Sequence, residues 1–565
     1  LGNNKPVRGL IEILKSYNFT IDENTLVDQE IALDPELLGK VFENLLASYN
    51  PETATTARKA TGSYYTPREI VDYMVEASLV EYLNSAVSIS AEQTDIKDAF
   101  GTLREKIRML LSYSEELPEF SDEERRKIIS AIDNIKILDP ACGSGAFPMG
   151  ILHKLVHVLQ KLDPENRYWY ELQYQRAIKE SEEVFKQEDK NQREERFKEI
   201  NETFDENINY PDYARKLYLI ENCIYGVDIQ PIAIQISKLR FFISIVLDQK
   251  VDRTKENLGI RALPNLETKF VAANTLLGLE KPRQASFGNE DIERKEEELK
   301  KLRHKYFTAK TRREKLENQN QDKKLREEIA TLLINDGWQN IFAEKIANFD
   351  LYDQNASADW FDPEWMFGVT DGFDIVIGNP PYIQLQKNSG GLANLYKNQD
   401  FTVFDRMGDI YTLFYEKGIK LLKPNGVLCY ITSNKWMRAG YGKKLRSFFL
   451  KQNPIQLIDL GPGIFESATV DTNILLIQKA DNKNSLKAVT LNKTNNETPD
   501  IEQYFNDNAV TLEKLTEDAW FIGSMAEQSL KEKIERIGKP LKNWDVNIYY
   551  GIKTGLNEAF IINIE

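Results

Sequence analysis

The chain has 565 residues, of which 41% are hydrophobic and 28% are charged, as in an ordinary globular protein with an ample core. This length predicts about three or four domain-sized units. The net charge of −15 excludes a uniformly basic coat for nucleic acid. The sequence has no apolar run of about 18 residues, so no membrane span is expected.

The three cysteines lie far apart in or beside apolar stretches, without the spacing of a disulfide framework or a zinc site. Buried free thiols are typical of a reducing compartment, which predicts a cytoplasmic location. The sequence begins with Leu1 rather than Met, and no signal-peptide pattern follows. This beginning indicates a fragment of a longer chain.

Residues 1–60 carry apolar side chains at helical spacing, which predicts an N-terminal helical region. Thr66 precedes Pro67, and Glu69 follows three positions after Thr66. This pattern predicts a helix that begins with Thr66 as its N-cap and Glu69 as the second half of a capping box. The backbone amides of such a helix start could receive a carboxylate, although a plain helix start explains the same residues.

A predicted strand at 135–138 runs into a loop that begins at Asp139, and a helix follows at 149–162. Strand, glycine turn and helix together are typical of a nucleotide-binding α/β fold. Gly143 and Gly145 do not have the spacing of the dinucleotide fingerprint, and the absence of Gly-Lys-Ser/Thr excludes a phosphate-binding loop. Small residues beside one carboxylate suit a cationic cofactor that carries an ammonium group, and S-adenosylmethionine is such a cofactor.

His153 and His157 are spaced i, i+4 on the predicted helix, as two metal ligands would be. A metal site needs a third ligand, and the sequence contains only one further histidine, His304. We therefore expect a helix face without a metal.

Two more predicted strands also end in polar residues. The strand at 224–231 reaches Asp228, whose carboxylate is placed to accept from two ribose hydroxyls. The strand at 268–274 ends at Asn274, which either contacts an adenine edge or simply ends the strand. Charged, helical stretches interrupt this pattern and are expected to be insertions, the last of them a projecting helical hairpin; they lie near 87–132, 160–210 and 288–335.

The strand predicted at 373–377 leads through Gly378 into the tetrapeptide Asn379-Pro380-Pro381-Tyr382. The two prolines restrict the backbone and favour an extended path. The Asn oxygen and a neighbouring backbone carbonyl can accept from an exocyclic amino group, while the Tyr ring stacks on the base that carries it. A simple proline turn after a strand is the alternative.

The C-terminal half continues with a polar loop at 386–406, a helix at 409–422 and strands at 427–432, 455–460 and 473–478. Phe465, between the last two strands, is either a loop anchor or a second stacking face opposite Tyr382. Residues 433–458 contain six basic residues and no acid, so DNA contacts are expected there. The predicted contacts are Lys435, Arg438, Lys443, Lys444 and Arg446.

In this order, the motifs resemble those of the gamma-class DNA adenine methyltransferases of single-chain, type IIG-like restriction-modification enzymes. The resemblance covers about residues 36–565. It implies an α/β fold with a Rossmann-like seven-stranded methyltransferase sheet and a hairpin at one edge. It further implies a methyltransferase domain at 61–480, then a connector and the start of a truncated target recognition domain at 481–565. Duplex DNA is the implied partner, with a nuclease or specificity partner in cis or in trans.

The resemblance also implies a role for each motif residue. The cofactor's methionine part is surrounded by Tyr65, Thr66 and Ala141; its charged end lies near Asp139, in the loop with Pro140, Gly143 and Gly145; its ribose is bound by Asp228; and its adenine is enclosed by Ile229, Asn274, Pro381 and Phe414. The target amino group is held by Asn379 and the carbonyl of Pro380, and the flipped base is stacked by Tyr382 and Phe465. An acid is more usual than Asn at position 274.

This chemistry localises the lone pair of an aromatic amine by accepting hydrogen bonds from both of its N–H groups. It requires no covalent enzyme intermediate, and the sequence lacks the Pro-Cys dipeptide expected of a cytosine-C5 enzyme. Two rivals share the chemistry: a protein glutamine N5-methyltransferase, which also uses Asn-Pro-Pro-Tyr, and an RNA adenine methyltransferase. A catalytically idle DNA-binding subunit is a third alternative, and amino-cytosine is an alternative target base.

Overall fold

The computed structural model describes the chain in two compact units, Leu1–Trp520 and Phe521–Glu565. The described residues are 49–50, 55–56, 66–88, 102–114, 116–184, 197–198, 200–205, 209–279, 290–465, 470–492, 499–523, 525–540, 543–544 and 546. Tyr65 and the predicted opening of a recognition domain near 549–557 therefore lie outside the described residues. Within 1–60, only two short strands are described, β1 (Tyr49–Asn50) and β2 (Thr55–Thr56), and they pair with each other.

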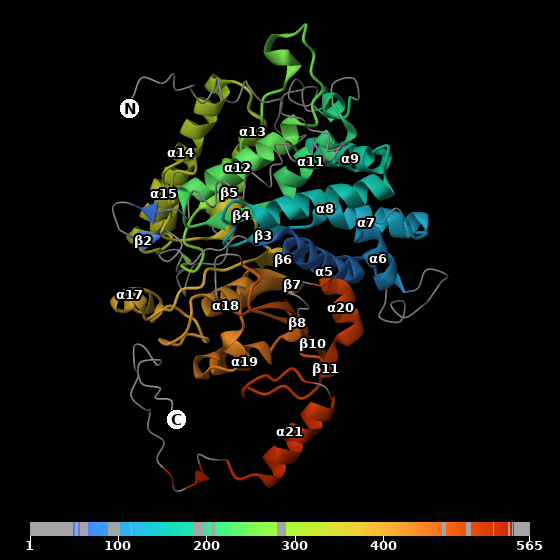
Figure 1. Ribbon diagram of the computed structural model, residues 1–565. Coiled ribbons are helices and arrows are strands. Elements are labelled where there is room, and N and C mark those ends of the chain that lie inside the picture. The colour runs from blue at the N-terminus through green and yellow to red at the C-terminus, as the bar shows by residue number, and fades with distance from the viewer. Residues whose placement is uncertain are drawn as a thin grey trace, which may run out of the picture. The chain divides into compact units, whose positions relative to one another are not determined.

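The first unit is built on a nine-stranded sheet of order β11-β10-β8-β9-β7-β6-β3-β4-β5 (Figure 1). Its central and β5-side strands are parallel, whereas β9 runs antiparallel to both β7 and β8. The strands are β3 (Ile137–Asp139), β4 (Ile224–Asp228), β5 (Phe270–Ala272), β6 (Phe373–Gly378), β7 (Leu422–Ser433), β8 (Asn453–Gly461), β9 (Thr472–Gln478), β10 (Leu486–Thr490) and β11 (Val510–Leu512).

The sheet confirms the predicted α/β fold and extends it. Seven neighbouring strands, from β5 to β8, correspond to the expected sheet with its β8–β9 hairpin. The strand count differs because β10 pairs parallel with β8, and β11 pairs antiparallel with β10. The sheet thus continues past residue 480, where the methyltransferase domain was expected to end.

Helices cover both faces of the central strands. Cys429 of β7 lies beside Ser78 of α5, whereas the neighbouring Leu428 and Tyr430 lie against Gly418 of α18. Because successive strand residues point to opposite faces, α5 and α18 lie on opposite sides of the sheet. These and the other helices of the first unit are α5 (Arg68–Val87), α6 (Leu103–Leu111), α7 (Asp122–Asn134), α8 (Ala146–Leu162), α9 (Arg167–Val184), α11 (Pro211–Asn222), α12 (Pro231–Val246), α13 (Glu290–Thr308), α14 (Arg312–Asn335), α15 (Asn340–Asn348), α16 (Pro363–Phe367), α17 (Lys387–Tyr396), α18 (Tyr411–Leu421), α19 (Lys443–Phe449) and α20 (Ile501–Asn508).

The described residues of the predicted insertions are mostly helical. Capping boxes begin α6, with Thr102 and Glu105, and α7, with Ser121 and Glu124. Each box satisfies backbone amides that a helix start leaves without partners, which explains where these helices begin. The apolar faces of α6 and α7 join the hydrophobic core that includes α5 and α8.

The expected hairpin is formed by α13 and α14 (Figure 1). A buried ionic cluster connects its two helices, with Asp322 accepting from Arg303 at 2.8 Å and from Arg326 at 2.7 Å. The same arginines donate to the carbonyls of Trp365 and Ala347. The cluster therefore ties the hairpin to α16 and α15, because a buried charge is stable only when it is paired.

One predicted loop is wrong. Residues 386–406 were expected to form a polar loop, but they contain α17. Ala393 N in this helix donates to Leu385 O, and Gly390 has a φ of 81°, which a glycine adopts without strain. The adjacent glycines, Gly390 and Gly391, made a helix an unfavourable prediction here.

The second unit contains helix α21 (Met525–Ile537) among its described residues. No helix in the described part of either unit combines the length and the apolar character that crossing a membrane requires.

Candidate active site

Four predicted site residues lie at the carboxyl ends of four neighbouring parallel strands. Asp139 ends β3 and Asp228 ends β4, while Asn379 directly follows β6 and Asn274 lies two residues past β5. The strand order β6-β3-β4-β5 brings all four ends to one edge of the sheet. Ligands of open α/β sheets bind at this edge.

The loop after β3 is held in shape by neighbouring elements. Gly143 N donates to Asp228 Oδ2 at 3.0 Å, and Ser237 Oγ of α12 donates to Gly143 O at 2.9 Å. Gly145 has a φ of 85°, and a Cβ on it would lie 2.9 Å from Ser237 Oγ. The loop therefore needs glycine at this position, both for its backbone conformation and for its close approach to α12.

The first residues of this loop also face the end of β5. Thr275 Oγ1 donates to Pro140 O at 2.7 Å, and Ala141 N donates to Asp139 Oδ1 at 3.1 Å. The predicted cofactor-binding loop thus contacts the ends of both β4 and β5, where Asp228 and Asn274 lie.

Asp139 is the buried carboxylate of the site, with 1% of its surface exposed. Its Oδ2 atom is buried without a hydrogen-bond partner among the described residues. Burial raises the pKa of Asp139 well above its usual range, and the nearby Asp228 raises it further. A Cβ on Gly378 would lie 2.6 Å from Asp139 Oδ1, so Gly378 is needed to make room for the carboxylate. An uncompensated buried carboxylate is costly, and a cationic ligand would compensate it.

Asp228 retains the capacity to accept from a ligand. Its Oδ1 accepts from Gln230 N at 2.8 Å and its Oδ2 accepts from Gly143 N. Burial raises the pKa of Asp228, and these backbone N–H groups act in the opposite direction. Each carboxylate oxygen has a second lone pair for a hydroxyl group. Next to it, the side chain of Ile229 is 59% exposed, an apolar surface beside the carboxylate.

Asn274 is connected to a helix that the sequence did not predict. Its Nδ2 donates to the hydroxyl of Tyr396 in α17 at 3.2 Å, and its Oδ1 accepts from Leu276 N at 3.2 Å. Tyr396 is buried. Phe414, also expected near the cofactor's adenine, is buried in α18.

Asn379 is oriented by Thr66, whose role differs from the prediction. Helix α5 begins at Arg68 with Pro67 as its N-cap and has no side-chain capping bond, so the expected capping box of Thr66 and Glu69 is wrong. Thr66 is buried, and its hydroxyl instead accepts from Asn379 Nδ2 at 3.1 Å. This bond directs the nitrogen end of the Asn379 amide toward Thr66 and leaves the oxygen at the other end.

Tyr382 and Phe465 are neighbours at the Asn379 motif. Their ring centroids are 6.2 Å apart with an interplanar angle of 57°, so the rings are tilted rather than parallel. The Tyr382 hydroxyl donates to Ile431 O at 3.3 Å, and Phe465 is 4% exposed. Phe465 therefore packs into the core, although it lies in a loop between two predicted strands.

Comparison with known proteins identifies the part of the chain that carries most of these residues. Residues 222–465 match a family model described as the Eco57I restriction-modification methylase. This part of the chain is similar to an Eco57I-type methylase domain. It begins just before β4 and ends at Phe465, so it includes Asp228, Asn274 and the Asn379 motif.

This chain spans less than half the length of the two relatives described next. A Methanocaldococcus jannaschii protein described as a type II restriction enzyme and methyltransferase is 26% identical over 84% of this chain and 40% of its own length. The Escherichia coli type II restriction enzyme and methyltransferase Eco57I is 26% identical over 34% of this chain and 19% of its own length. Among solved structures, the type IIL restriction-modification enzyme MmeI in complex with DNA is 12% identical, with a TM-score of 0.40 over 85% of this chain and 43% of that one.

Four of the five residues predicted to contact DNA lie on the surface of the basic segment, residues 433–458. Lys435, Arg438, Lys443 and Lys444 are exposed. Arg446 is not: it is 4% exposed and donates to the carbonyls of Trp436, Ala439 and Glu517. Its prediction as a DNA contact is wrong, because its guanidinium holds this segment together from inside.

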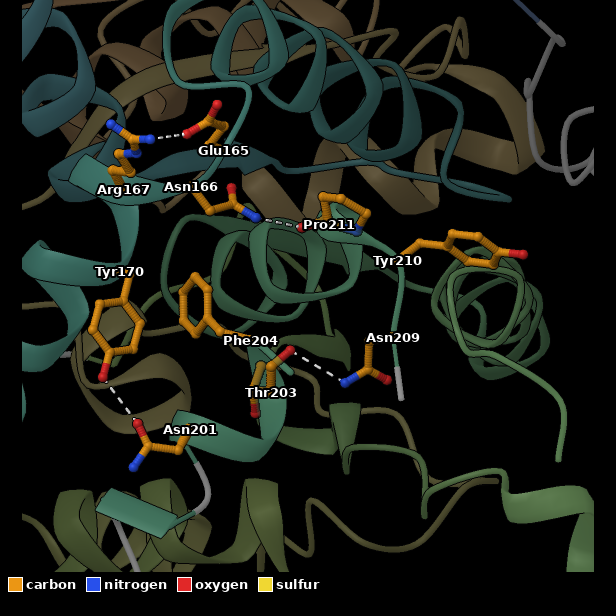
Figure 2. A pocket seen from close by; sticks show the side chains of 10 residues that line it. All are labelled: Glu165, Asn166, Arg167, Tyr170, Asn201, Thr203, Phe204, Asn209, Tyr210 and Pro211. Atoms are coloured by element: carbon orange, nitrogen blue, oxygen red, sulfur yellow. Dashed lines mark hydrogen bonds and ion pairs between the residues drawn. The ribbon is translucent and has the colours of Figure 1, made fainter. Parts of the chain in front are cut away.

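A cavity of about 340 Å³ lies in the insertion near 160–210 and is lined by none of the predicted site residues (Figure 2). Its polar side chains connect the surrounding segments: Asn166 donates to Pro211 O, Asn209 to Thr203 O, and Tyr170 to Asn201. These bonds indicate a gap within the insertion rather than a second reactive centre.

Proposed function

We propose that this protein transfers a methyl group from S-adenosylmethionine to N6 of a flipped adenine in duplex DNA, as part of a restriction-modification system. One observation carries the proposal: the Asn379 amide at the end of β6 shares a sheet edge with the buried carboxylate of Asp139 at the end of β3. The match of residues 222–465 to a methylase family supports it.

The chain's own residues fit the cofactor. When bound, S-adenosylmethionine supplies an electrophilic methyl group. Asp139, whose Oδ2 is buried without a partner among the described residues, would face the cofactor's positive charge, and Asp228 would accept from its ribose hydroxyls. Asn274, Ile229, Pro381 and Phe414 would surround the adenine.

The target amino group is bound by acceptors that rest on a rigid strand. Asn379 Oδ1 and the carbonyl of Pro380 accept from the two N–H groups, so the nitrogen lone pair is no longer delocalised into the ring. Thr66 keeps the amide oriented by accepting from its nitrogen. Positioning then supplies much of the remaining rate enhancement. Reactants that are already bound avoid the entropy loss of a bimolecular encounter, which is worth up to about 7–11 kcal/mol.

A flipped adenine must leave its stack, which costs a few kcal/mol. Stacking on an aromatic side chain returns about 1–3 kcal/mol per base. Tyr382 supplies one ring at the Asn379 motif, and Phe465 beside it would supply a second after turning out of the core. Two such contacts offset the cost of extrusion.

Incubation of the full chain with labelled S-adenosylmethionine and unmethylated genomic DNA tests the proposal. We expect label in DNA, recovered as N6-methyladenine after digestion to nucleosides. Label in N4-methylcytosine would identify the other amino base as the target. Label in RNA or protein but not in DNA, or no incorporation at all, would overturn the proposal.

Replacement of Phe465 tests the stacking face. We expect Phe465→Ala to weaken binding to duplexes with a mismatched target pair more than binding to fully paired duplex, because only an extruded base uses the ring. Since Phe465 is buried, the variant also loses about 3–5 kcal/mol of unfolding free energy. Phe465→Leu, which keeps most of the volume, controls for stability, and equal losses on both duplexes would contradict the role.

Replacement of surface cations tests the DNA contacts. The triple variant Lys435→Gln, Arg438→Gln, Lys444→Gln is expected to reduce the slope of log K against log salt by about 3, since each phosphate contact releases about one counterion. A matched triple variant on the exposed face of the α13–α14 hairpin controls for net charge: Lys301→Gln, Lys305→Gln, Lys323→Gln. Equal slopes for the two variants in fluorescence-anisotropy titrations would show that DNA does not contact the predicted segment.

A further inference from the structure

One ring contact and one hydrogen bond connect the Tyr382 ring to the predicted DNA-contact segment. The ring of Tyr411, the first residue of α18, meets the ring of Tyr382 edge-on, with centroids 6.0 Å apart and an interplanar angle of 81°. The Tyr411 hydroxyl lies 2.8 Å from the hydroxyl of Tyr441. Tyr441 belongs to the short 3-10 helix η5 (Gly440–Gly442), which directly precedes α19.

The hydrogen bonds from Tyr411 through Tyr441 end at the buried carboxylate of Asp409. The number of available protons decides which hydroxyl donates in each bond. The Tyr441 hydroxyl donates its single proton to Asp409 Oδ2 at 3.0 Å. It must therefore accept from Tyr411, which donates. Asp409 is buried, and the Lys435 and Lys387 ammonium groups act on it as nearby positive charges.

The backbone beside Asp409 is bonded to the backbone after the Asn379 motif. Leu385 N donates to Gly408 O at 2.9 Å, and Ile410 N donates to Ile383 O at 2.9 Å. The strand-like segment that begins at Tyr382 is therefore fixed to the segment that carries Asp409 and Tyr411. Residues 408–411 thus contact both the backbone that follows Tyr382 and the ring of Tyr382.

We propose that Tyr411, Tyr441 and Asp409 are positioning residues that set the ring of Tyr382 for the target base and connect it to the DNA-contact segment around Lys435. This inference rests on the proposed function. An edge-on ring limits the tilt of its neighbour, and the hydroxyl chain limits the position of the Tyr411 ring. Since Tyr441 lies between Arg438 and Lys443 in sequence, phosphate contacts made there are transmitted to the base site through one side chain.

Tyr411, Tyr441 and Asp409 together form a bridge between the Tyr382 ring and the DNA-contact segment. Removal of one hydroxyl tests this bridge. Tyr441→Phe keeps the ring and breaks both hydrogen bonds, and we expect the single-turnover methylation rate on genomic DNA to fall about fivefold to tenfold. The affinities for S-adenosylmethionine and for non-specific DNA should stay within about twofold of the parent, because the hydrogen bonds of this hydroxyl are made to Tyr411 and Asp409. Tyr415→Phe is the matched control on the same helix: it removes a buried hydroxyl that is bonded to Thr432 instead.

Three further results distinguish positioning from a general loss of structure. Tyr411→Phe combined with Tyr441→Phe should be no slower than either single variant, since both break the same chain. Asp409→Asn keeps an acceptor and should retain a near-parental rate, whereas Asp409→Ala should match Tyr441→Phe. A crystal structure of Tyr441→Phe should show the Tyr382 ring rotated from its parental position, a readout that does not depend on activity.

The outcomes separate this inference from the function on which it rests. A parent protein that methylates DNA, with a Tyr441→Phe variant at the parental rate and an unmoved Tyr382 ring, overturns the bridge alone. Additive losses in the double variant, or a Tyr415→Phe variant as slow as Tyr441→Phe, overturn it too. A parent protein that modifies no DNA overturns the proposed function, and the crystal structures then decide whether the bridge positions Tyr382.

Discussion

Asn379→Ala is expected to abolish methyl transfer, with a single-turnover rate at least about 100-fold below that of the parent. The variant loses the acceptor that localises the lone pair of the target amine, an interaction made most strongly in the transition state. S-adenosylmethionine affinity, measured by calorimetry, should remain within about threefold, because Asp139 and Asp228 are unchanged. Loss of cofactor binding would show that Asn379 is part of the cofactor site instead.

The bond between Asn379 and Thr66 allows a sharper version of the same experiment. Thr66→Val removes the hydroxyl that accepts from Asn379 Nδ2 but keeps the side chain's shape. We expect a partial fall in rate, about fivefold to tenfold, since the amide stays in place but is less firmly oriented. In Asn379→Ala, the further change Thr66→Val should have no effect on the rate. An equal effect in both backgrounds would mean that Thr66 acts independently of Asn379.

The sheet edge was predictable because its signals are local. Each of Asp139, Asp228 and Asn379 follows a short apolar run that is recognisable as a buried strand, and parallel strands place their carboxyl ends together. The polar residue after each run thus shares an edge with the others, whatever lies between them in sequence. The long helical insertions did not disturb this inference, because they enter and leave between the strands.

Contacts between distant segments were not predictable in this way. Thr66 has the sequence pattern of a helix cap, but its hydroxyl accepts a hydrogen bond from Asn379, which lies 313 positions away. Arg446 lies among exposed cations in sequence, yet the carbonyls of its own segment hold it inside. The Tyr411–Tyr441–Asp409 bridge has no periodicity or motif, because Tyr441 lies 30 residues after Tyr411 in sequence and 32 after Asp409.

The second large effect is expected from Asp139→Asn, which removes a charge and preserves the shape of the side chain. We expect S-adenosylmethionine to bind about 10-fold to 100-fold more weakly by calorimetry, since a bond to a charged group is worth about 1.5–3 kcal/mol. Asp374→Asn is the matched control: this carboxylate in β6 pairs with Lys423 and accepts from Lys136 N. That variant should lose stability and keep its cofactor affinity. If Asp139→Asn instead lost stability and kept its cofactor affinity, Asp139 would be a structural residue.

The raised pKa of Asp139 sets the sign of two pH dependences. Burial raises its folded-state pKa above the unfolded value near 3.9, so above about pH 4 the native state without ligand binds more protons than the unfolded state. Its stability therefore falls, relative to that of Asp139→Asn, as pH rises toward the folded pKa, where the difference levels off. A cationic ligand favours the ionised carboxylate, so the parent's cofactor affinity should rise as pH rises from about 4 toward the folded-state pKa, and that of Asp139→Asn should stay nearly flat. Parallel affinity curves for the two proteins would remove Asp139 from the cofactor site, whereas diverging curves would place the cofactor's positive charge at the end of β3.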